Sequence, residues 1–178
     1  MKKSRLWVFG YGSLMWNPGF SHDRAEIARL NGYARSFCMR SIHHRGTLAN
    51  PGLVLALDPT DGAFCTGMAL RVSTGSEQDT ILYLRERELV SSAYLETTLQ
   101  IQLADGEKID AVTFVVDVDH EQYCGGLPLD EQAQIIAAAV GGRGKNSDYL
   151  NSTADHLAGL GIKDTDLDWL ANAVKNNT

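Results

Sequence analysis

The chain has 178 residues, 44% of them hydrophobic and 21% charged, which suits one globular domain that folds without disulfide bonds or a structural metal ion. Its formal net charge of −6 argues against a nucleic-acid-binding or anionic membrane surface, which would need clustered Lys and Arg. Three distant cysteines without a CxxC pair indicate neither a disulfide framework nor a zinc site. The apolar stretch near the N-terminus is too short for a signal peptide or a membrane span, so we expect a cytoplasmic protein.

The first part of the chain predicts short strands joined by turns. Leu6–Phe9 is an apolar run stopped by a glycine-containing segment, as in a buried strand that enters a tight loop. A turn at Asp58–Gly62 separates two further apolar runs. The strands expected in this part are residues 6–9, 32–40, 53–57 and 66–72.

The second part predicts one helix, a hairpin and then further helices. Residues 74–89 have a helical pattern that Ser73 or Thr74 could cap. Strands are expected at 95–103 and 109–118 around the turn Asp105-Gly106, and helices at 130–140, 147–157 and 165–174. Strands first and helices late favour a single α+β domain over residues 1–178, with a small mixed β-barrel flanked by helices.

The loop Gly10-Tyr-Gly-Ser-Leu14 is the first candidate site. Two glycines after a buried strand allow successive backbone N–H groups to turn inward and bind an anion. A dinucleotide fingerprint would need glycine at Met15, so this loop is a poor match to one. A tight exit from the strand, with no ligand, is the structural alternative.

A glutamate at the end of the predicted helix is the second candidate. On the helical projection Glu88 lies within an apolar arc, whereas Glu86 lies just outside it. The arc contains Ile81, Leu82, Leu84 and Leu89. A carboxylate on the core side has a raised pKa unless it is paired, and a general base near neutral pH needs such a pKa. The structural alternative is a Glu88 that pairs with an arginine.

The segment His43-His44-Arg45-Gly46 offers weaker possibilities. Adjacent histidines seldom face one metal, so a structural or substrate-positioning use is favoured. A Ser13–His44 pair with an acidic partner stays open, although the loop lacks a GxSxG elbow. The cysteines, Cys38, Cys65 and Cys124, are expected to be buried small hydrophobes.

Four blocks of the sequence, in order, resemble the motifs of one protein family. Val8-Phe-Gly-Tyr-Gly-Ser-Leu-Met-Trp16 is similar to the family's signature loop. His44-Arg-Gly46 with Pro51-Gly52 is similar to its second block, and Tyr83-Leu-Arg-Glu-Arg-Glu88 with Tyr94 resembles the catalytic segment. Asn146-Ser-Asp-Tyr-Leu150 matches a later helix start. Over residues 6 to 155 the chain thus resembles the ChaC-type γ-glutamylcyclotransferases. The resemblance implies a small mixed β-barrel flanked by helices.

The resemblance implies roles for particular residues. Glu88 would be the catalytic carboxylate and Tyr149 would close the pocket. Relatives often have glycines before the tyrosine that matches Tyr94, whereas this chain has Ser91-Ser-Ala93, so the turn after Glu88 is expected to differ. The γ-glutamyl group would be held by Val8, Phe9, Gly10, Tyr11, Gly12, Ser13 and Leu14.

The implied activity is the cleavage of glutathione to 5-oxoproline and cysteinylglycine by attack of the substrate's own α-amine, without a metal or another cofactor. The implied partner is therefore a small molecule. Two alternatives stay open: a cyclotransferase for other γ-glutamyl amides or amines, and a non-catalytic module that binds a small anion at the Gly10–Leu14 loop.

Overall fold

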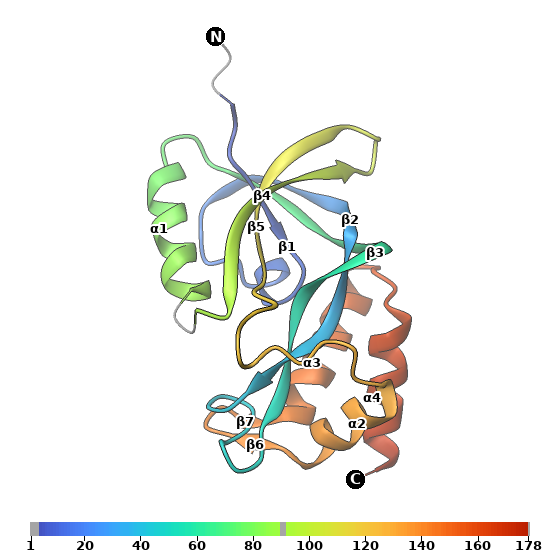
Figure 1. Cartoon of the computed structure of the whole chain (residues 1–178). Coiled ribbons are helices and arrows are strands. Elements are labelled where there is room, and N and C mark those ends of the chain that lie inside the picture. Colours follow the sequence, from blue (N-terminus) through green and yellow to red (C-terminus); the bar gives the residue numbers. More distant parts are fainter. Residues whose placement is uncertain (1–3, 90–91, 178) are drawn as a thin grey trace. The chain divides into compact units, whose positions relative to one another are not determined.

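The computed structural model describes residues 4–89 and 92–177 (Figure 1). The chain divides into two compact units. The first runs up to Arg35 and resumes over Leu57–His120, and the second comprises Ser36–Ala56 and the residues from Glu121 onward. Two long strands, β2 (His22–Ser41) and β3 (Gly52–Val72), contribute residues to both units. Whether the whole chain behaves as one domain stays a prediction.

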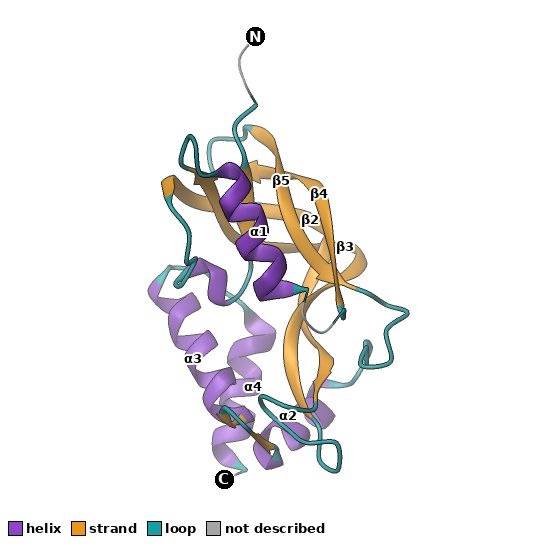
Figure 2. Ribbon diagram, turned by 90° about the vertical axis from the view of Figure 1, so that its left-hand side faces the viewer, coloured by secondary structure: helices purple, strands orange, loops and turns teal. Residues whose placement is uncertain are grey.

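The first unit contains a closed barrel with the strand order β1-β3-β2-β4-β5. Its shorter strands are β1 (Trp7–Gly10), β4 (Tyr94–Leu103) and β5 (Lys108–Val116). β1 pairs antiparallel with β3 and parallel with β5, so the barrel is mixed. Helix α1 (Glu77–Glu88) packs against it (Figure 2). The predicted α+β fold with a small mixed barrel is confirmed.

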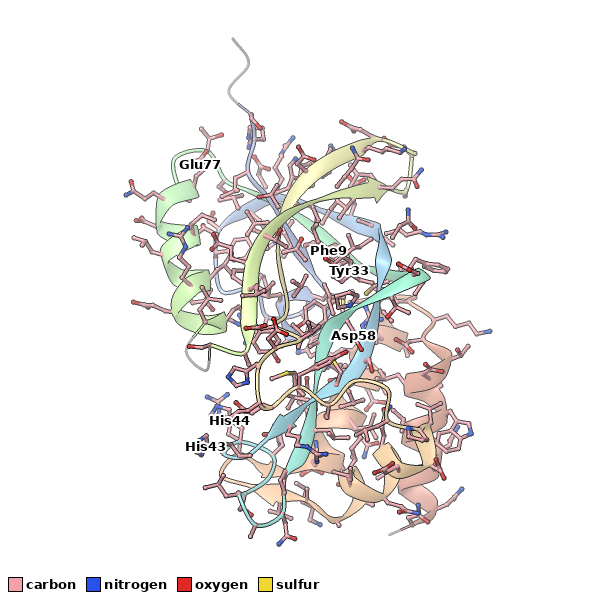
Figure 3. All side chains as sticks on the ribbon, viewed as in Figure 1. Phe9, Tyr33, His43, His44, Asp58 and Glu77 are labelled. Atoms are coloured by element: carbon pink, nitrogen blue, oxygen red, sulfur yellow. The ribbon has the colours of Figure 1, made fainter. Side chains whose placement is uncertain are left out.

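Both faces of β1 are buried, which explains its continuous apolar sequence. Successive side chains of a strand point to opposite faces. Trp7 and Phe9 (Figure 3) join one apolar cluster, which includes Leu30 and Ile101. Val8, between them, joins a second cluster that contains residues of α1 and β5. β1 therefore anchors the loop that follows it to two separate parts of the core.

The two long strands differ from the predicted pattern. β2 begins at His22, whereas the predicted strand begins at residue 32. The first half of β2 gave no strand signal because it is largely polar and only Ala28 and Leu30 are fully buried there. β3 continues through the predicted turn at Asp58–Gly62, so the expectation of two strands is wrong. Residues 59–62 are exposed, and Gly62 has φ +77°, a left-handed backbone that glycine adopts freely.

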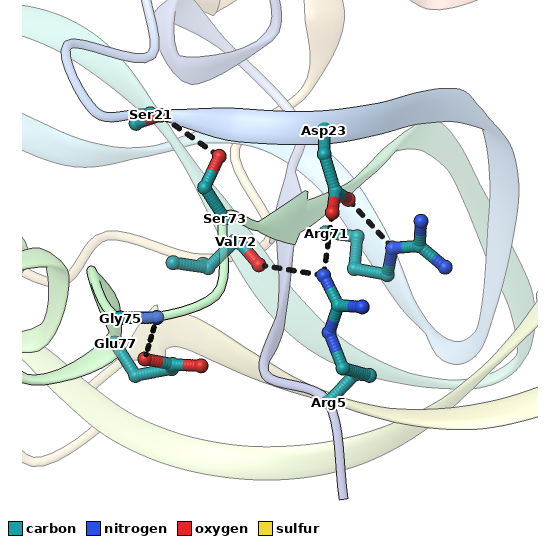
Figure 4. A network of polar contacts seen from close by, with 8 residues as sticks. All are labelled: Arg5, Ser21, Asp23, Arg71, Val72, Ser73, Gly75 and Glu77. Carbon is teal, nitrogen blue, oxygen red and sulfur yellow. Dashed lines mark hydrogen bonds and ion pairs between the residues drawn. The ribbon is translucent and has the colours of Figure 1, made fainter.

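The start of α1 is fixed by local polar contacts (Figure 4). The helix begins at Glu77, not at Thr74, and Ser76 is its N-cap residue. The Glu77 carboxylate accepts a hydrogen bond of 2.8 Å from the Gly75 N–H group. Gly75 has φ +92°, which removes residues 74 and 75 from the helix.

A second contact group holds the strands that lead to α1. Asp23 on β2 pairs with both Arg5 and Arg71, and the Ser21 and Ser73 hydroxyls are 2.8 Å apart (Figure 4). The hydrogen bond from Arg71 lowers the pKa of Asp23. These contacts join the N-terminal segment, β2 and the end of β3.

The second unit packs three helices together: α2 (Leu129–Ala138), α3 (Asn146–Gly159) and α4 (Thr165–Asn176) (Figure 2). The short strands β6 (Val140–Gly141) and β7 (Gly144–Lys145) pair between the first two helices. All three predicted helices are confirmed within a few residues. No helix in the described part of the chain is long and apolar enough to cross a membrane.

The turn after Glu88 contains a strained residue. Val90 and Ser91 lie outside the described residues, but Ser92 has φ +58° and Ala93 is buried. A left-handed backbone costs a residue with a side chain roughly 1–2 kcal/mol, whereas glycine adopts it freely at an entropic cost of about 0.5–1 kcal/mol.

Ser92→Gly is therefore expected to stabilise the protein by up to about 1 kcal/mol, which raises Tm by about 2–4 °C for a chain of this size. Thermal unfolding of the two proteins side by side measures the difference. A lower Tm for the variant would show that the Ser92 backbone conformation carries no strain.

Candidate active site

The loop after β1 presents backbone N–H groups that have no acceptor among the described residues. It contains the short turn η1 (Ser13–Met15), closed by a hydrogen bond of 2.9 Å from the Met15 N–H to the Gly12 carbonyl. Among the described residues, the N–H groups of Gly12, Ser13 and Leu14 donate to no acceptor. A Cβ atom added to Gly12 would meet nothing within 4 Å. The loop thus combines three unpaired donors with open space, as an anion site requires.

The remaining residues of this motif support the loop. The side chains of Val8, Phe9 and Leu14 are buried, so a ligand would meet only their backbone atoms. The Tyr11 carbonyl accepts a hydrogen bond of 2.8 Å from Nε of Arg35 on β2. A Cβ on Gly10 would approach Leu14 Cβ to 3.0 Å, so glycine permits the close turn.

Glu88 is the last residue of α1 and it is largely shielded from water. Its side chain is 20% exposed, whereas the side chain of Glu86, on the same helix, is largely exposed. Burial raises the pKa of the Glu88 carboxyl, and the neighbouring Arg87 partly opposes this rise. The expected difference between the two glutamates is present. The apolar arc is narrower than expected, because Leu82 is 53% exposed.

Arg87 connects this helix end with the loop. One terminal nitrogen donates to Ser13 Oγ at 2.8 Å, and the other donates to the carbonyls of Asn17 and Pro18 at 2.7 and 3.2 Å. Nε of Arg87 lies 3.5 Å from Oε1 of Glu88. Residue 88 is thus next in sequence to a side chain that holds the candidate anion-binding loop.

Apolar contacts reinforce the same association. The second core cluster contains Leu14 from the loop and Leu84 from α1, together with Val8 and Phe114 from the barrel. Leu84 is fully buried. The helix therefore cannot move away from the loop without exposing this cluster.

Ser13 does not have the surroundings of a nucleophile. Its hydroxyl accepts a hydrogen bond from the Arg87 guanidinium, which is a permanent cation and cannot take a proton. A serine nucleophile needs an adjacent general base. The contact instead makes Ser13 a ligand-binding or loop-stabilising residue.

Two of the other sequence motifs meet within the second unit. Gly46 and Gly52 lie so close that a Cβ on either would overlap the opposite backbone. The fully buried Asn146 accepts from the Leu53 N–H and donates to the Leu53 carbonyl, both at 2.8 Å. Arg45 donates to the Arg143 and Lys145 carbonyls, at 3.0 and 3.2 Å. These contacts indicate a structural role for the block His44-Arg-Gly46 with Pro51-Gly52.

Tyr149 belongs to this group of contacts. Its hydroxyl accepts a hydrogen bond of 3.2 Å from the Leu55 N–H, and its ring stands edge-on to Phe37 with centroids 6.0 Å apart. The Arg45 guanidinium carbon lies 5.7 Å from the ring centroid. Its role in closing a substrate pocket stays a prediction.

The histidines and cysteines do not form a metal centre in the described part of the chain. His43 and His44 are exposed (Figure 3), and the surroundings of His44 lower its pKa, through partial burial first and then the charges of Arg143, His43 and Arg45. No group of three or more His, Cys, Asp or Glu among the described residues could hold a metal ion. The three cysteines, all in the described part of the chain, form no disulfide; Cys38 and Cys65 are buried, as expected, and Cys124 is half-buried.

Two arginines that support the loop were not predicted from the sequence. Arg35 lies within a long strand and gave no local signal. Arg87 did have one, because it directly precedes Glu88 in the motif, but its loop partner Ser13 is 74 residues away.

The sequence matches the family described as ChaC-like protein over residues 6–177. The chain belongs to the ChaC-like family. The glutathione-specific gamma-glutamylcyclotransferase of Escherichia coli is 38% identical over 96% of this chain and 73% of its own length. The human glutathione-specific gamma-glutamylcyclotransferase 1 is 34% identical over 95% of this chain and 78% of its own.

A solved structure has the same fold as this ChaC-like protein. It is the yeast cyclotransferase described as specific to glutathione, with a TM-score of 0.85 and 25% sequence identity. The match covers 98% of this chain and 97% of the yeast chain. The resemblance expected from four short motifs therefore extends over the whole fold.

Proposed function

We propose that this ChaC-like protein is a γ-glutamylcyclotransferase that converts glutathione to 5-oxoproline and cysteinylglycine. The observation that carries the proposal is the shielded Glu88 carboxyl, with a raised pKa, next to Arg87, which binds the loop. Three N–H groups of that loop donate to no acceptor among the described residues. The names of the bacterial, human and yeast relatives support glutathione as the substrate.

The substrate contains its own nucleophile. The α-amine of a γ-glutamyl group can attack the γ-carbonyl carbon and close a five-membered ring, and intramolecular closure avoids most of the entropy cost of joining two reactants. At neutral pH this amine is an ammonium and cannot attack. Glu88 removes one proton, and the freed amine attacks the γ-carbonyl carbon. The attacking nitrogen loses a second proton as the lactam forms and the bond to cysteine breaks. The departing nitrogen takes up both protons, one of them from Glu88, and leaves as an ammonium.

The loop supplies the binding site for the γ-glutamyl group. The N–H groups of Gly12, Ser13 and Leu14 can donate to the α-carboxylate or to the oxyanion that forms at the γ-carbon. The open space beside Gly12 leaves room for the glutamyl backbone. The reaction consumes no water and needs no added reactant, because every atom of glutathione appears in the two products.

The three cysteines lie far apart in the sequence and include no CxxC pair, a pattern that suits a reducing compartment, so the cytoplasm is the proposed location.

Product analysis tests the proposal. The purified protein is incubated with glutathione, γ-glutamyl-alanine and γ-glutamyl-lysine, and 5-oxoproline is measured by mass spectrometry. Release from glutathione at a rate well above the other two is the expected result. A faster release from another γ-glutamyl compound would reassign the substrate, and binding of glutathione without product would identify a non-catalytic module.

The pKa of Glu88 predicts the pH dependence of kcat/KM. The base is active when it is ionised, so kcat/KM should fall as the pH is lowered through the raised pKa of Glu88. We expect the midpoint of this acidic limb of the pH profile to lie above the pKa of a free glutamate, which is about 4.3. A rate profile from pH 4 to 9 measures it, and constant kcat/KM down to about pH 4 would show that no shielded carboxylate is required.

A further inference from the structure

We propose that Arg87 is a positioning residue that holds the Glu88 end of α1 and the Ser13–Pro18 turn in one fixed geometry. This inference rests on the proposed function, because it assumes that Glu88 is the base and that the loop binds the γ-glutamyl group. It adds a residue that acts through these two elements rather than on the substrate.

The guanidinium nitrogens of Arg87 contact both the Ser13–Pro18 turn and the Glu88 end of α1. One terminal nitrogen holds the Ser13 hydroxyl, and the other holds the Asn17 and Pro18 carbonyls, so both ends of the turn are engaged. Nε faces the Glu88 carboxylate at 3.5 Å. The Arg87 side chain is only 19% exposed. A shielded guanidinium with this many partners is strongly restricted, and its planar fork loses little entropy when it binds several acceptors.

A tyrosine completes the arrangement. The Tyr83 hydroxyl lies one helical turn before Arg87 and accepts a hydrogen bond of 3.1 Å from it. Gly19, with φ +75°, follows the turn and lies against the same hydroxyl, where a Cβ would overlap the ring of Tyr83. Arg87 is thus held from its own helix while it holds the turn.

The geometry separates two contributions of Arg87. The fork fixes the turn through three acceptors, which a lysine cannot match because its ammonium is a point charge. The positive charge also lies beside Glu88 and favours its ionised form. Tyr83 on α1 and Tyr94 on β4 pack against the cluster that contains Leu84. The Glu96 carboxylate accepts two hydrogen bonds from the Arg85 guanidinium, at 2.9 and 3.0 Å.

Two substitutions test these contributions. Arg87→Met removes the fork and the charge, and it should lower kcat/KM by about tenfold to a hundredfold, mainly through kcat, since small displacements of reacting groups have effects of this size. Its acidic limb should move to higher pH, because the charge that lowers the pKa of Glu88 is gone. Arg87→Lys keeps the positive charge but not the planar fork. Its acidic limb should therefore lie at the wild-type pH, while its kcat should stay below that of the wild type.

Arg85→Met is the matched control, since Arg85 is on the same helix and its fork binds Glu96 rather than the loop. Its kcat, KM and acidic limb should match the wild type. Hydrogen exchange gives a readout that does not depend on catalysis. The amides of residues 15–17 donate to the Gly12 and Ser13 carbonyls, and they should exchange faster in Arg87→Met and at the wild-type rate in Arg85→Met.

The outcomes separate this inference from the proposed function. If the wild type forms 5-oxoproline and Glu88→Gln does not, the function stands. Wild-type kcat, pH profile and exchange in Arg87→Met would then overturn the positioning role alone. If Arg87→Met does not fold, Arg87→Lys decides: full wild-type kcat with wild-type exchange of the turn overturns the role, and reduced kcat with a wild-type limb supports it.

Discussion

Replacement of Glu88 by glutamine should reduce kcat by about a hundredfold to ten-thousandfold, the usual contribution of a general acid–base group. Glutamine has nearly the same shape as glutamate but cannot accept the proton of the substrate ammonium. Initial rates of 5-oxoproline formation at saturating glutathione measure the effect. A kcat within about threefold of the wild type would remove Glu88 from the mechanism, since a lost base costs far more than that.

Glu86→Gln is the control for this change, because residue 86 is exposed on the same helix and its kcat should be unaltered. A measurement of the stability of Glu88→Gln separates a loss of catalysis from a loss of folding. The folded-state pKa of Glu88 is raised, so this group contributes stability at low pH that is lost as the pH rises through that pKa. At pH 7 the neutral glutamine should leave the protein at least as stable as the wild type.

Replacement of Asn146 by alanine should destabilise the second unit strongly. The Asn146 side chain satisfies both backbone groups of Leu53, and both residues are fully buried. Alanine leaves an N–H and a C=O group without partners at the start of β3. Each costs about 1–3 kcal/mol, so we expect a loss of about 2–6 kcal/mol in the free energy of unfolding. Urea denaturation measures this loss.

Asn151→Ala provides the comparison, because Asn151 is the same residue type on the same helix but is exposed. Its free energy of unfolding should stay within about 0.5 kcal/mol of the wild type. Equal stability of Asn146→Ala and Asn151→Ala would mean that water replaces the side-chain contacts to Leu53.

The parts of the fold that the sequence could predict have local causes. The apolar run before Gly10 and the alternation in residues 95–103 reflect burial of one strand or one face at a time. Glu88 could be singled out because a charge among apolar helix positions is visible within one turn of sequence. The pattern predicted the orientation of Glu88, although the exposed Leu82 shows that it overestimated the buried arc.

The missed features depend on contacts between distant residues. The first half of β2 is held by pairing and by the Asp23 ion pairs, which leave no apolar signal. Leu53 and Asn146 are 93 residues apart, and no pattern within either segment identifies the other. The same holds for Arg87 and Ser13, so the link between the candidate base and the loop could only be found in three dimensions.

A crystal structure of the Glu88→Gln protein with intact glutathione bound tests the central claim most directly. The substrate's α-nitrogen should lie about 2.6–3.2 Å from the side chain of residue 88, the reach of a general base. The glutamyl carboxylate or γ-carbonyl oxygen should lie against the N–H groups of residues 12–14. A glutamyl group bound elsewhere, with its amine far from residue 88, would contradict the account.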